Sequence, residues 1–270
     1  MKKRPMLKLF FHDFTYGFSY GKHKYIVFYS MIGLLSLMIS FQLKPLGSNS
    51  IATFFLLLKD NGYIKQLSDY QVPFYWDFIQ FSVLFLIGDF LFQDIENKRI
   101  YLLLRSRSKS HYILSKIFWV VVQNILIYIG LFTTIYIISS LALGDFSLGK
   151  SPYFKQNIVP LMVTKVTPGQ LLLNILLGFI ITSVLLSSIL LLFIQFSPPI
   201  MIFFGVIVIS SISTFSSIKW LPAIHSMILK RDIFNMEHHL TLGFSIIYCL
   251  VLYAFVTTFT FFVFKKIDTP

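Results

Sequence analysis

Long runs of apolar residues dominate the chain, and short polar stretches separate them. Six of these runs are long enough to cross about 30 Å of hydrocarbon as helices that rise about 1.5 Å per residue. The pattern therefore predicts six membrane-spanning helices, at Tyr25–Leu43, Phe74–Phe92, Ile117–Leu143, Leu171–Ile194, Ile200–Ile218 and Leu242–Phe264. The expected fold class is an all-α, polytopic membrane protein in which residues 1–270 form a single transmembrane domain.

The composition supports this interpretation. Apolar residues make up 56% of the chain and charged residues 13%, whereas a soluble domain has about 25% charged residues. The net charge of +12 would suggest nucleic acid as a partner in a soluble protein. Here we expect no nucleic acid, because most Lys and Arg residues fall on one side of the predicted spans. That bias predicts that both termini are cytoplasmic.

The first 24 residues predict a helix that lies in the membrane interface before the first span. Apolar residues recur at helical spacing on one face, at Leu7, Phe11, Phe14 and Phe18. The other faces are polar, with Lys8, His12, Thr15 and Ser19. Two roles stay open, namely a juxtamembrane helix resting on anionic lipid and an elbow that positions the first span against a partner subunit.

The predicted cytoplasmic loop, residues 93–116, has acidic residues first, an apolar centre and basic residues last. In a short helix this order would complement the helix dipole. The apolar centre, Ile100–Leu104, needs lipid or another protein to cover it. A basic inner loop is expected of any membrane protein, so charge alone does not separate these two alternatives.

The order of residues in this loop resembles the first cytoplasmic loop of ABC type-2 exporter permeases. Glu96 stands where that family has an acid, Ser108-Lys109 where it has Ser-Arg, and Ser115-Lys116 where it has Gly-Lys. The family's Gly-Thr after the acid is replaced by Lys98-Arg99. The layout is similar too, with an interfacial first helix, six spans, a short turn between the fourth and fifth spans and a re-entrant-sized segment before the last.

The resemblance implies a coupling loop that docks on a cytosolic ATPase subunit. The residues it would use are Glu96, Lys98, Arg99, Arg105, Arg107, Lys109, Tyr112 and Lys116. The chain would be the non-catalytic permease subunit of an ATP-driven exporter in a bacterial plasma membrane. It would bind membrane lipids, no cofactor, a second permease subunit (identical or paralogous) and ATPase subunits. The expected substrate is an amphipathic peptide, toxin or lipid; the alternative function is a non-transporting immunity, scaffold or assembly protein.

Two spans carry polar residues whose roles need interpretation. Asp89 is an acid inside the second span, where an unpaired charge costs several kcal/mol. We expect it to pair with a basic residue of the N-terminal arm rather than to line a pathway. The fifth span is rich in small and hydroxylated residues, which favours close helix packing within the bundle over a lining for a substrate path or a subunit interface.

Three further features are expected to carry no chemistry. Gly144–Ser151 satisfies the phosphate-loop spacing G-x-x-x-x-G-K-[ST], but a predicted spanning helix precedes it and Pro152 follows it, where a phosphate loop needs a strand and a helix. The single cysteine, Cys249, allows no internal disulfide. The six histidines are expected to be solvated loop residues rather than metal ligands, at His12, His23, His111, His225, His238 and His239.

Overall fold

The computed structural model describes residues 5–63, 72–97, 108–237 and 239–266. Within these ranges the chain forms helices joined by turns and loops, and it contains no strand. The all-helical class expected from the apolar runs is therefore confirmed.

Five of the described helices are long and apolar enough to cross a membrane. They are α1 (Pro5–Leu43), α3 (Phe74–Asn97), α5 (Lys109–Leu143), α6 (Pro168–Phe193) and α8 (Leu242–Lys266). A sixth apolar helix, α7 (Pro199–Phe215), fills the fifth predicted run with only 17 residues. The described chain thus has five clear spanning candidates where the sequence predicts six, because α7 ends at Phe215 rather than at Ile218.

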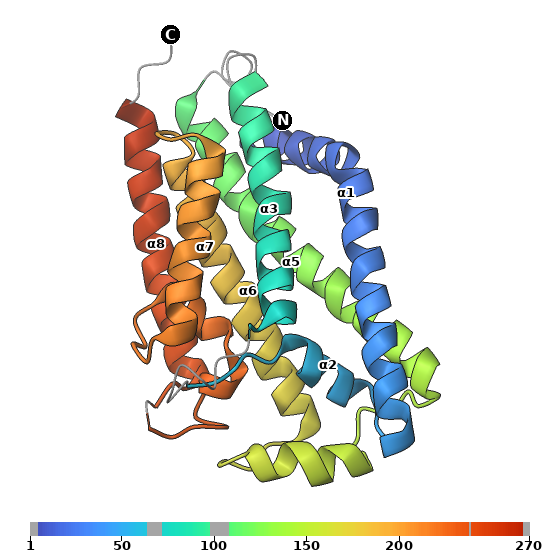
Figure 1. Cartoon of the computed structure of the whole chain (residues 1–270). Helices are drawn as coiled ribbons and strands as arrows, with labels where there is room; N and C mark the ends of the chain where they lie inside the picture. The colour runs from blue at the N-terminus through green and yellow to red at the C-terminus, as the bar shows by residue number, and fades with distance from the viewer. Residues whose placement is uncertain (1–4, 64–71, 98–107, 238, 267–270) are drawn as a thin grey trace.

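α1 joins the predicted arm and the first predicted span into one continuous helix. Its 39 residues correspond to about 58 Å, about twice the hydrocarbon thickness of a bilayer. Figure 1 shows that its first turns lie across one end of the bundle and that the remainder runs along the bundle. α1 begins and α8 ends at this same end, which we call the terminal end (Figure 1). The opposite end is the distal end.

The first turns of α1 have one face toward the bundle and one face away from it. The predicted apolar stripe faces away, because Leu7, Phe11 and Phe18 are 42%, 63% and 59% exposed. The opposite face is buried and includes Asp13 and Gly17. The helix is therefore anchored by residues outside the stripe, and its placement in a membrane interface stays a prediction.

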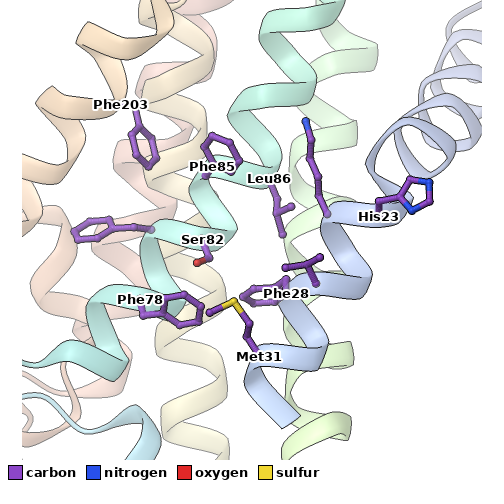
Figure 2. Close-up of a pocket in the computed structure, with 11 residues that line it drawn as sticks. His23, Phe28, Met31, Phe78, Ser82, Phe85, Leu86 and Phe203 are labelled. Carbon is purple, nitrogen blue, oxygen red and sulfur yellow. The ribbon is translucent and has the colours of Figure 1, made fainter. Parts of the chain in front are cut away.

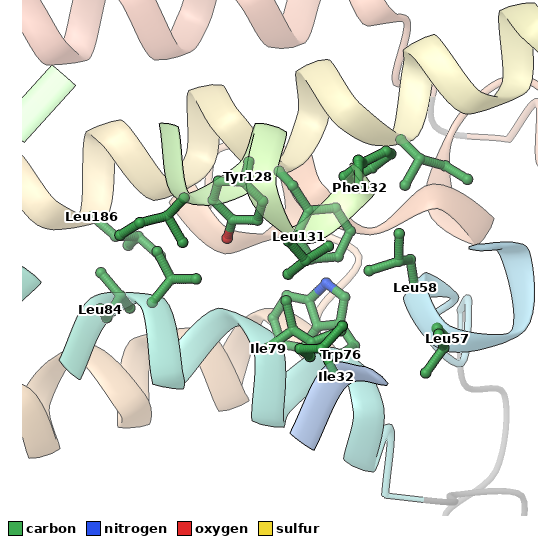
Figure 3. Close-up of a cluster of buried hydrophobic side chains, with 14 of the residues drawn as sticks. Ile32, Leu57, Leu58, Trp76, Ile79, Leu84, Tyr128, Leu131, Phe132 and Leu186 are labelled. Atoms are coloured by element: carbon green, nitrogen blue, oxygen red, sulfur yellow. The ribbon is translucent and has the colours of Figure 1, made fainter. Parts of the chain in front are cut away.

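The core lies where α1, α2, α3, α5 and α6 meet. Figure 3 shows Ile32, Leu58, Trp76, Tyr128 and Leu131 converging there, and each is 0% exposed. α6 is the most enclosed of the spanning candidates, since 67% of its most apolar stretch is buried, against 17% for α8. α6 is therefore central in the bundle, and α8 lies at its edge.

Segments predicted as loops at the distal end fold back into the bundle. α2 (Ser50–Leu58) has eight buried residues out of nine, and the Ser50 and Ser140 hydroxyls are 2.9 Å apart. The segment before α8 forms two short 3-10 helices that are also mostly buried, Pro222–Ser226 and Ile228–Lys230. The other short helical turns are Lys44–Leu46, Phe154–Ile158 and Val159–Leu161.

Large apolar side chains cover the outer surface of the helices. Ile200 and Phe204 on α7 are 83% and 66% exposed, and Phe255 on α8 is 69% exposed. Monomeric soluble proteins rarely expose so much apolar surface to water. The surface and the five long apolar helices are compatible with a multi-pass membrane protein.

Candidate functional site

A buried ionic cluster joins the helices on both sides of the predicted coupling loop. The Lys116 ammonium lies 2.9 Å from a carboxylate oxygen of Asp13 and 2.7 Å from one of Asp94, and all three side chains are at most 2% exposed. The Tyr112 hydroxyl donates a hydrogen bond of 2.7 Å to Asp94, and the Ser115 hydroxyl donates one of 2.8 Å to Asp13. We call these five residues the basal cluster.

The basal cluster ties three helices together by charge. Asp13 comes from α1, Asp94 from the end of α3, and the other three residues from the start of α5. Aromatic rings complete the surroundings of Lys116, whose ammonium lies 5.3 Å from the centre of the Phe90 ring. Separating α1 or α3 would break one of these two buried ion pairs, and separating α5 would break both and leave two buried carboxylates without a counter-ion.

The residues predicted to contact an ATPase subunit fall into two groups, those outside the described residues and those within α3 and α5. Lys98, Arg99, Arg105 and Arg107 lie outside the described residues. Glu96 belongs to the last turn of α3, and Lys109 is the first residue of α5 and is partly buried. Both helices therefore extend into the predicted loop of residues 93–116, leaving only residues 98–108 between them.

Tyr112 and Lys116 require a correction. Both were expected on the surface of the loop, but each is only 1% exposed and both belong to the basal cluster. A side chain enclosed by its own chain cannot contact a separate subunit directly. Their role in this structure is to hold the start of α5 against α1 and α3.

The dipole interpretation of the loop is also wrong for its acidic part. Asp94 and Glu96 lie near the carboxyl end of α3, where the helix dipole disfavours negative charge. For Asp94 the direct contact with Lys116 offsets this unfavourable position. The acids therefore belong to α3 and do not begin a separate loop helix.

Asp89 forms the ion pair that its intramembrane position led us to expect. Its carboxylate accepts a hydrogen bond from the ammonium of Lys24 on α1, which also lies 3.4 Å from the Tyr20 hydroxyl. The Lys24 and Asp89 side chains are 37% and 23% exposed. This second link between α1 and α3 is more open than the basal cluster.

A second group of buried charges lies in the segment before α8, at the distal end. Lys230 is 1% exposed and donates hydrogen bonds of 2.8, 2.8 and 3.0 Å to the backbone carbonyls of Ser213, Thr214 and Ser216. These carbonyls end α7, so the ammonium caps the negative end of its dipole. Burial lowers the pKa of Lys230 to about 8, while the negative charge of Asp60 acts in the opposite direction.

Asp60 also contacts the segment before α8, through the backbone of Leu229. One of its carboxylate oxygens accepts hydrogen bonds from the backbone N–H of Gly62 (2.9 Å) and of Leu229 (3.2 Å). The side chain is enclosed, and burial raises the pKa of Asp60 to about 6 in spite of these hydrogen bonds. Asp60 therefore titrates close to neutral pH.

His225 was expected to be a solvated loop histidine, and this prediction is wrong. The side chain is 0% exposed, and its Nδ1 lies 3.0 Å from the Ser245 hydroxyl of α8. Burial and the nearby Arg231 charge lower the pKa of His225 to about 3, so the ring is neutral at pH 7. The 3-10 segment folds inward, and sequence spacing gave no sign of this.

The guanidinium of Arg231 packs against α6 at Gly178, where the absence of a side chain leaves a notch in the helix surface. Its guanidinium donates hydrogen bonds to the backbone carbonyl of Asn174 (3.1 Å) and to that of His225 (2.7 Å). A Cβ atom added at Gly178 would lie 2.3 Å from one guanidinium nitrogen. Gly178 is therefore required for this contact.

Gly144–Ser151 is built as a loop that follows a helix. Gly144 ends the 35-residue helix α5 with a φ of 75°, and no strand precedes it. The carbonyls of Ser147 and Gly149 accept hydrogen bonds from the side-chain amide of Asn49, at 3.3 and 2.8 Å. These contacts attach the loop to the segment before α2.

Sequence reasoning missed Asp13 as a member of the site. The signal available was that Asp13 is the lone acid among the first 24 residues, in an arm rich in basic residues. Its position off the apolar stripe indicated a separate face, but not which helices would meet it.

Comparison of the chain with known protein families, with curated proteins and with solved structures finds no match.

Proposed function

We propose that this chain is the transmembrane permease subunit of an ATP-driven exporter of the ABC type-2 class. The observation that carries the proposal is the basal cluster, which fastens both flanks of the predicted coupling loop to α1. A force applied by an ATPase at residues 98–108 would reach α1, α3 and α5 together, since none can move alone without breaking a buried ion pair. This is the mechanical requirement for a coupling loop.

On this proposal α7 is the sixth span. Its 17 residues correspond to about 26 Å, near the lower limit for crossing a bilayer. Six crossings fit the finding that α1 begins and α8 ends at the same end (Figure 1). That end would be cytoplasmic, in a bacterial plasma membrane.

The remaining parts of the exporter come from other subunits. ATP hydrolysis belongs to a cytosolic ATPase, and a second permease subunit, identical or paralogous, completes the pathway. The substrate class is an amphipathic peptide, toxin or lipid. The contact with the ATPase falls on Glu96 and Lys109, together with the four basic residues Lys98, Arg99, Arg105 and Arg107.

The test is the ATPase activity of the assembled complex in nanodiscs. Lys109→Glu is expected to abolish the stimulation of ATP hydrolysis by the permease, and the unfolding temperature of the variant is measured alongside to establish that it is folded. Lys150→Glu is the matched control, because Lys150 is an exposed lysine at the distal end. Equal ATPase rates for both variants would remove the coupling role, and would favour an immunity or scaffold protein that acts without ATP.

A further inference from the structure

The ring of His225 is enclosed at the distal end by uncharged groups. Its Nδ1 lies 3.0 Å from the Ser245 hydroxyl of α8, and its centre lies 4.6 Å from that of the Tyr248 ring. Its Nε2 is buried and has no hydrogen-bond partner among the described residues. The site therefore holds a neutral imidazole and gives its second nitrogen nothing to bind.

The helices packed around His225 supply no acid that could pair with a protonated ring. α6 and α7 contain no Asp, Glu, Lys, Arg or His residue. In α8 the charged residues are Lys265 and Lys266 in the last turn, and Tyr248 and Cys249 are the titratable groups near the ring. A positive charge on the ring would have no counter-ion from any of these three helices.

The charges of the segment before α8 do not pair with the ring either. The Arg231 guanidinium donates a 2.7 Å hydrogen bond to the His225 carbonyl, which places a like charge beside the ring. Asp60 binds the backbone N–H groups of Gly62 and Leu229, and the negative charge of Asp232 acts on Arg231. Protonation of His225 in place would therefore add a second buried positive charge next to Arg231.

Opening of the segment changes how tightly His225 binds a proton. Burial and the Arg231 charge lower the pKa of His225 from 6.5 to about 3 while the segment is in place. A ring exposed to water by opening would return to its ordinary pKa. The open state then binds the proton more tightly than the closed state, so opening is favoured as the pH falls below 6.5.

The segment also holds α7. This helix packs mainly on α3, α6 and the 3-10 helix Pro222–Ser226, and Lys230 binds the carbonyls at its end. Toward α1 a groove of about 500 Å³ lies beside Phe203 of α7 (Figure 2). Because α7 has few neighbours, departure of the segment would loosen its distal end.

We propose that Pro222–Arg231 is an acid-released latch, in which protonation of His225 drives its ring away from α8 and withdraws Lys230 from the end of α7. The latch does not depend on the exporter function, because proton uptake needs neither ATP nor an ATPase subunit. Asp60 opposes it, since the raised pKa of Asp60 means that acidification favours the closed position of that carboxyl group.

The test is hydrogen exchange of the whole chain in mild detergent at pH 7 and pH 5, read at the hydrogen-bonded amides of Met227, Arg231 and Phe234. The parent is Asp60→Asn, which lacks the opposing titration. After correction for the intrinsic pH dependence of exchange, opening in this parent is expected to increase about 20-fold from pH 7 to pH 5.

Adding His225→Gln to this parent keeps a side chain that can bind the Ser245 hydroxyl but removes the titration, so the increase is expected to disappear. His239→Gln, at an exposed histidine just before α8, is the matched control and should retain it. Equal increases in both variants, or no increase in the parent, would overturn the proposal.

A second measurement needs no substitution at His225. Cys249 lies one turn after Ser245 on α8 and is 2% exposed. A disulfide reagent that reacts at acidic pH should modify this thiol faster at pH 5 than at pH 7 in the Asp60→Asn protein, each rate being divided by that of a free thiol. Equal ratios at the two pH values would show that the segment does not open.

Discussion

Asp13 of α1 and Lys116 of α5 form a buried ion pair with 2.9 Å between their charged atoms. In the sequence, Asp13 comes before the first predicted span and Lys116 comes after the second. Asp94 of α3 shares the same ammonium at 2.7 Å. The first turns of the chain and both flanks of the predicted coupling loop are thereby held as one unit. A helix that moves at this end must carry the other two with it.

The first prediction concerns the ammonium of this cluster. Lys116→Met leaves Asp13 and Asp94 buried without their counter-ion, so we expect a loss of about 3–5 kcal/mol in the free energy of unfolding. The measurement is the free energy of unfolding of the variant and of the unsubstituted protein in mild detergent. Lys8→Met, at an exposed position of α1, should change stability by less than about 0.5 kcal/mol. Comparable small losses in both variants would mean that the cluster contributes little.

The second prediction concerns the Lys24–Asp89 pair. Asp89→Ala leaves Lys24 unpaired in the membrane and should lower the unfolding temperature. The exchanged variant Lys24→Asp/Asp89→Lys keeps one charge of each sign and should recover much of that loss. Failure of the exchange to improve on Asp89→Ala would show that the contact is not governed by charge.

The third prediction concerns pH and Asp60. Because the pKa of Asp60 is raised from 3.8 to about 6 in the folded protein, the folded state binds a proton more tightly than the unfolded state does. Stability from this group is therefore greatest below about pH 4 and is lost as the pH rises through 6. Asp60→Asn lacks this titration.

Unfolding temperatures of the unsubstituted protein and Asp60→Asn, measured from pH 4 to pH 7, check this expectation. The unsubstituted protein should gain stability relative to the variant on acidification, by an amount on the order of 2 kcal/mol. Taking the difference between the two proteins removes the opposite contribution of His225, whose lowered pKa favours the folded state at higher pH. A difference that does not vary with pH would contradict the buried position of Asp60.

The fourth prediction concerns the notch in α6. Gly178→Ala would force its methyl group against the guanidinium of Arg231 and the carbonyl of His225, which lie 2.3 and 2.9 Å from the added atom. We expect a loss of about 1–3 kcal/mol in stability. Gly205→Ala in α7 is the matched control, because nothing lies within 4 Å of its added Cβ. Similar stability of the two variants would show that Arg231 is not held at this notch.

The sequence was sufficient for features that depend on one stretch of chain. The apolar runs predicted α5, α6 and α8 because their length and composition fit a membrane span whatever lies beside them. The cost of a lone acid in hydrocarbon predicted a partner for Asp89, and Lys24 is that partner.

Features that depend on several segments could not be predicted in this way. The burial of Lys116 and Tyr112 depends on which faces of α1 and α3 meet the start of α5. α2 was missed because nine residues are too few to span a membrane, and they form a buried helix only when packed between longer ones. His225 is buried because two short 3-10 turns fold inward, and short turns leave no periodic pattern in the sequence.

The most direct test of the proposed exporter function is purification of the tagged chain from its native membrane in mild detergent, with identification and quantification of what remains bound. We expect an ATPase subunit in stoichiometric amount that is lost from the Lys109→Glu variant and retained by Lys150→Glu. If the chain is purified alone, or with a partner that has no nucleotide site, it is not an ATP-driven permease.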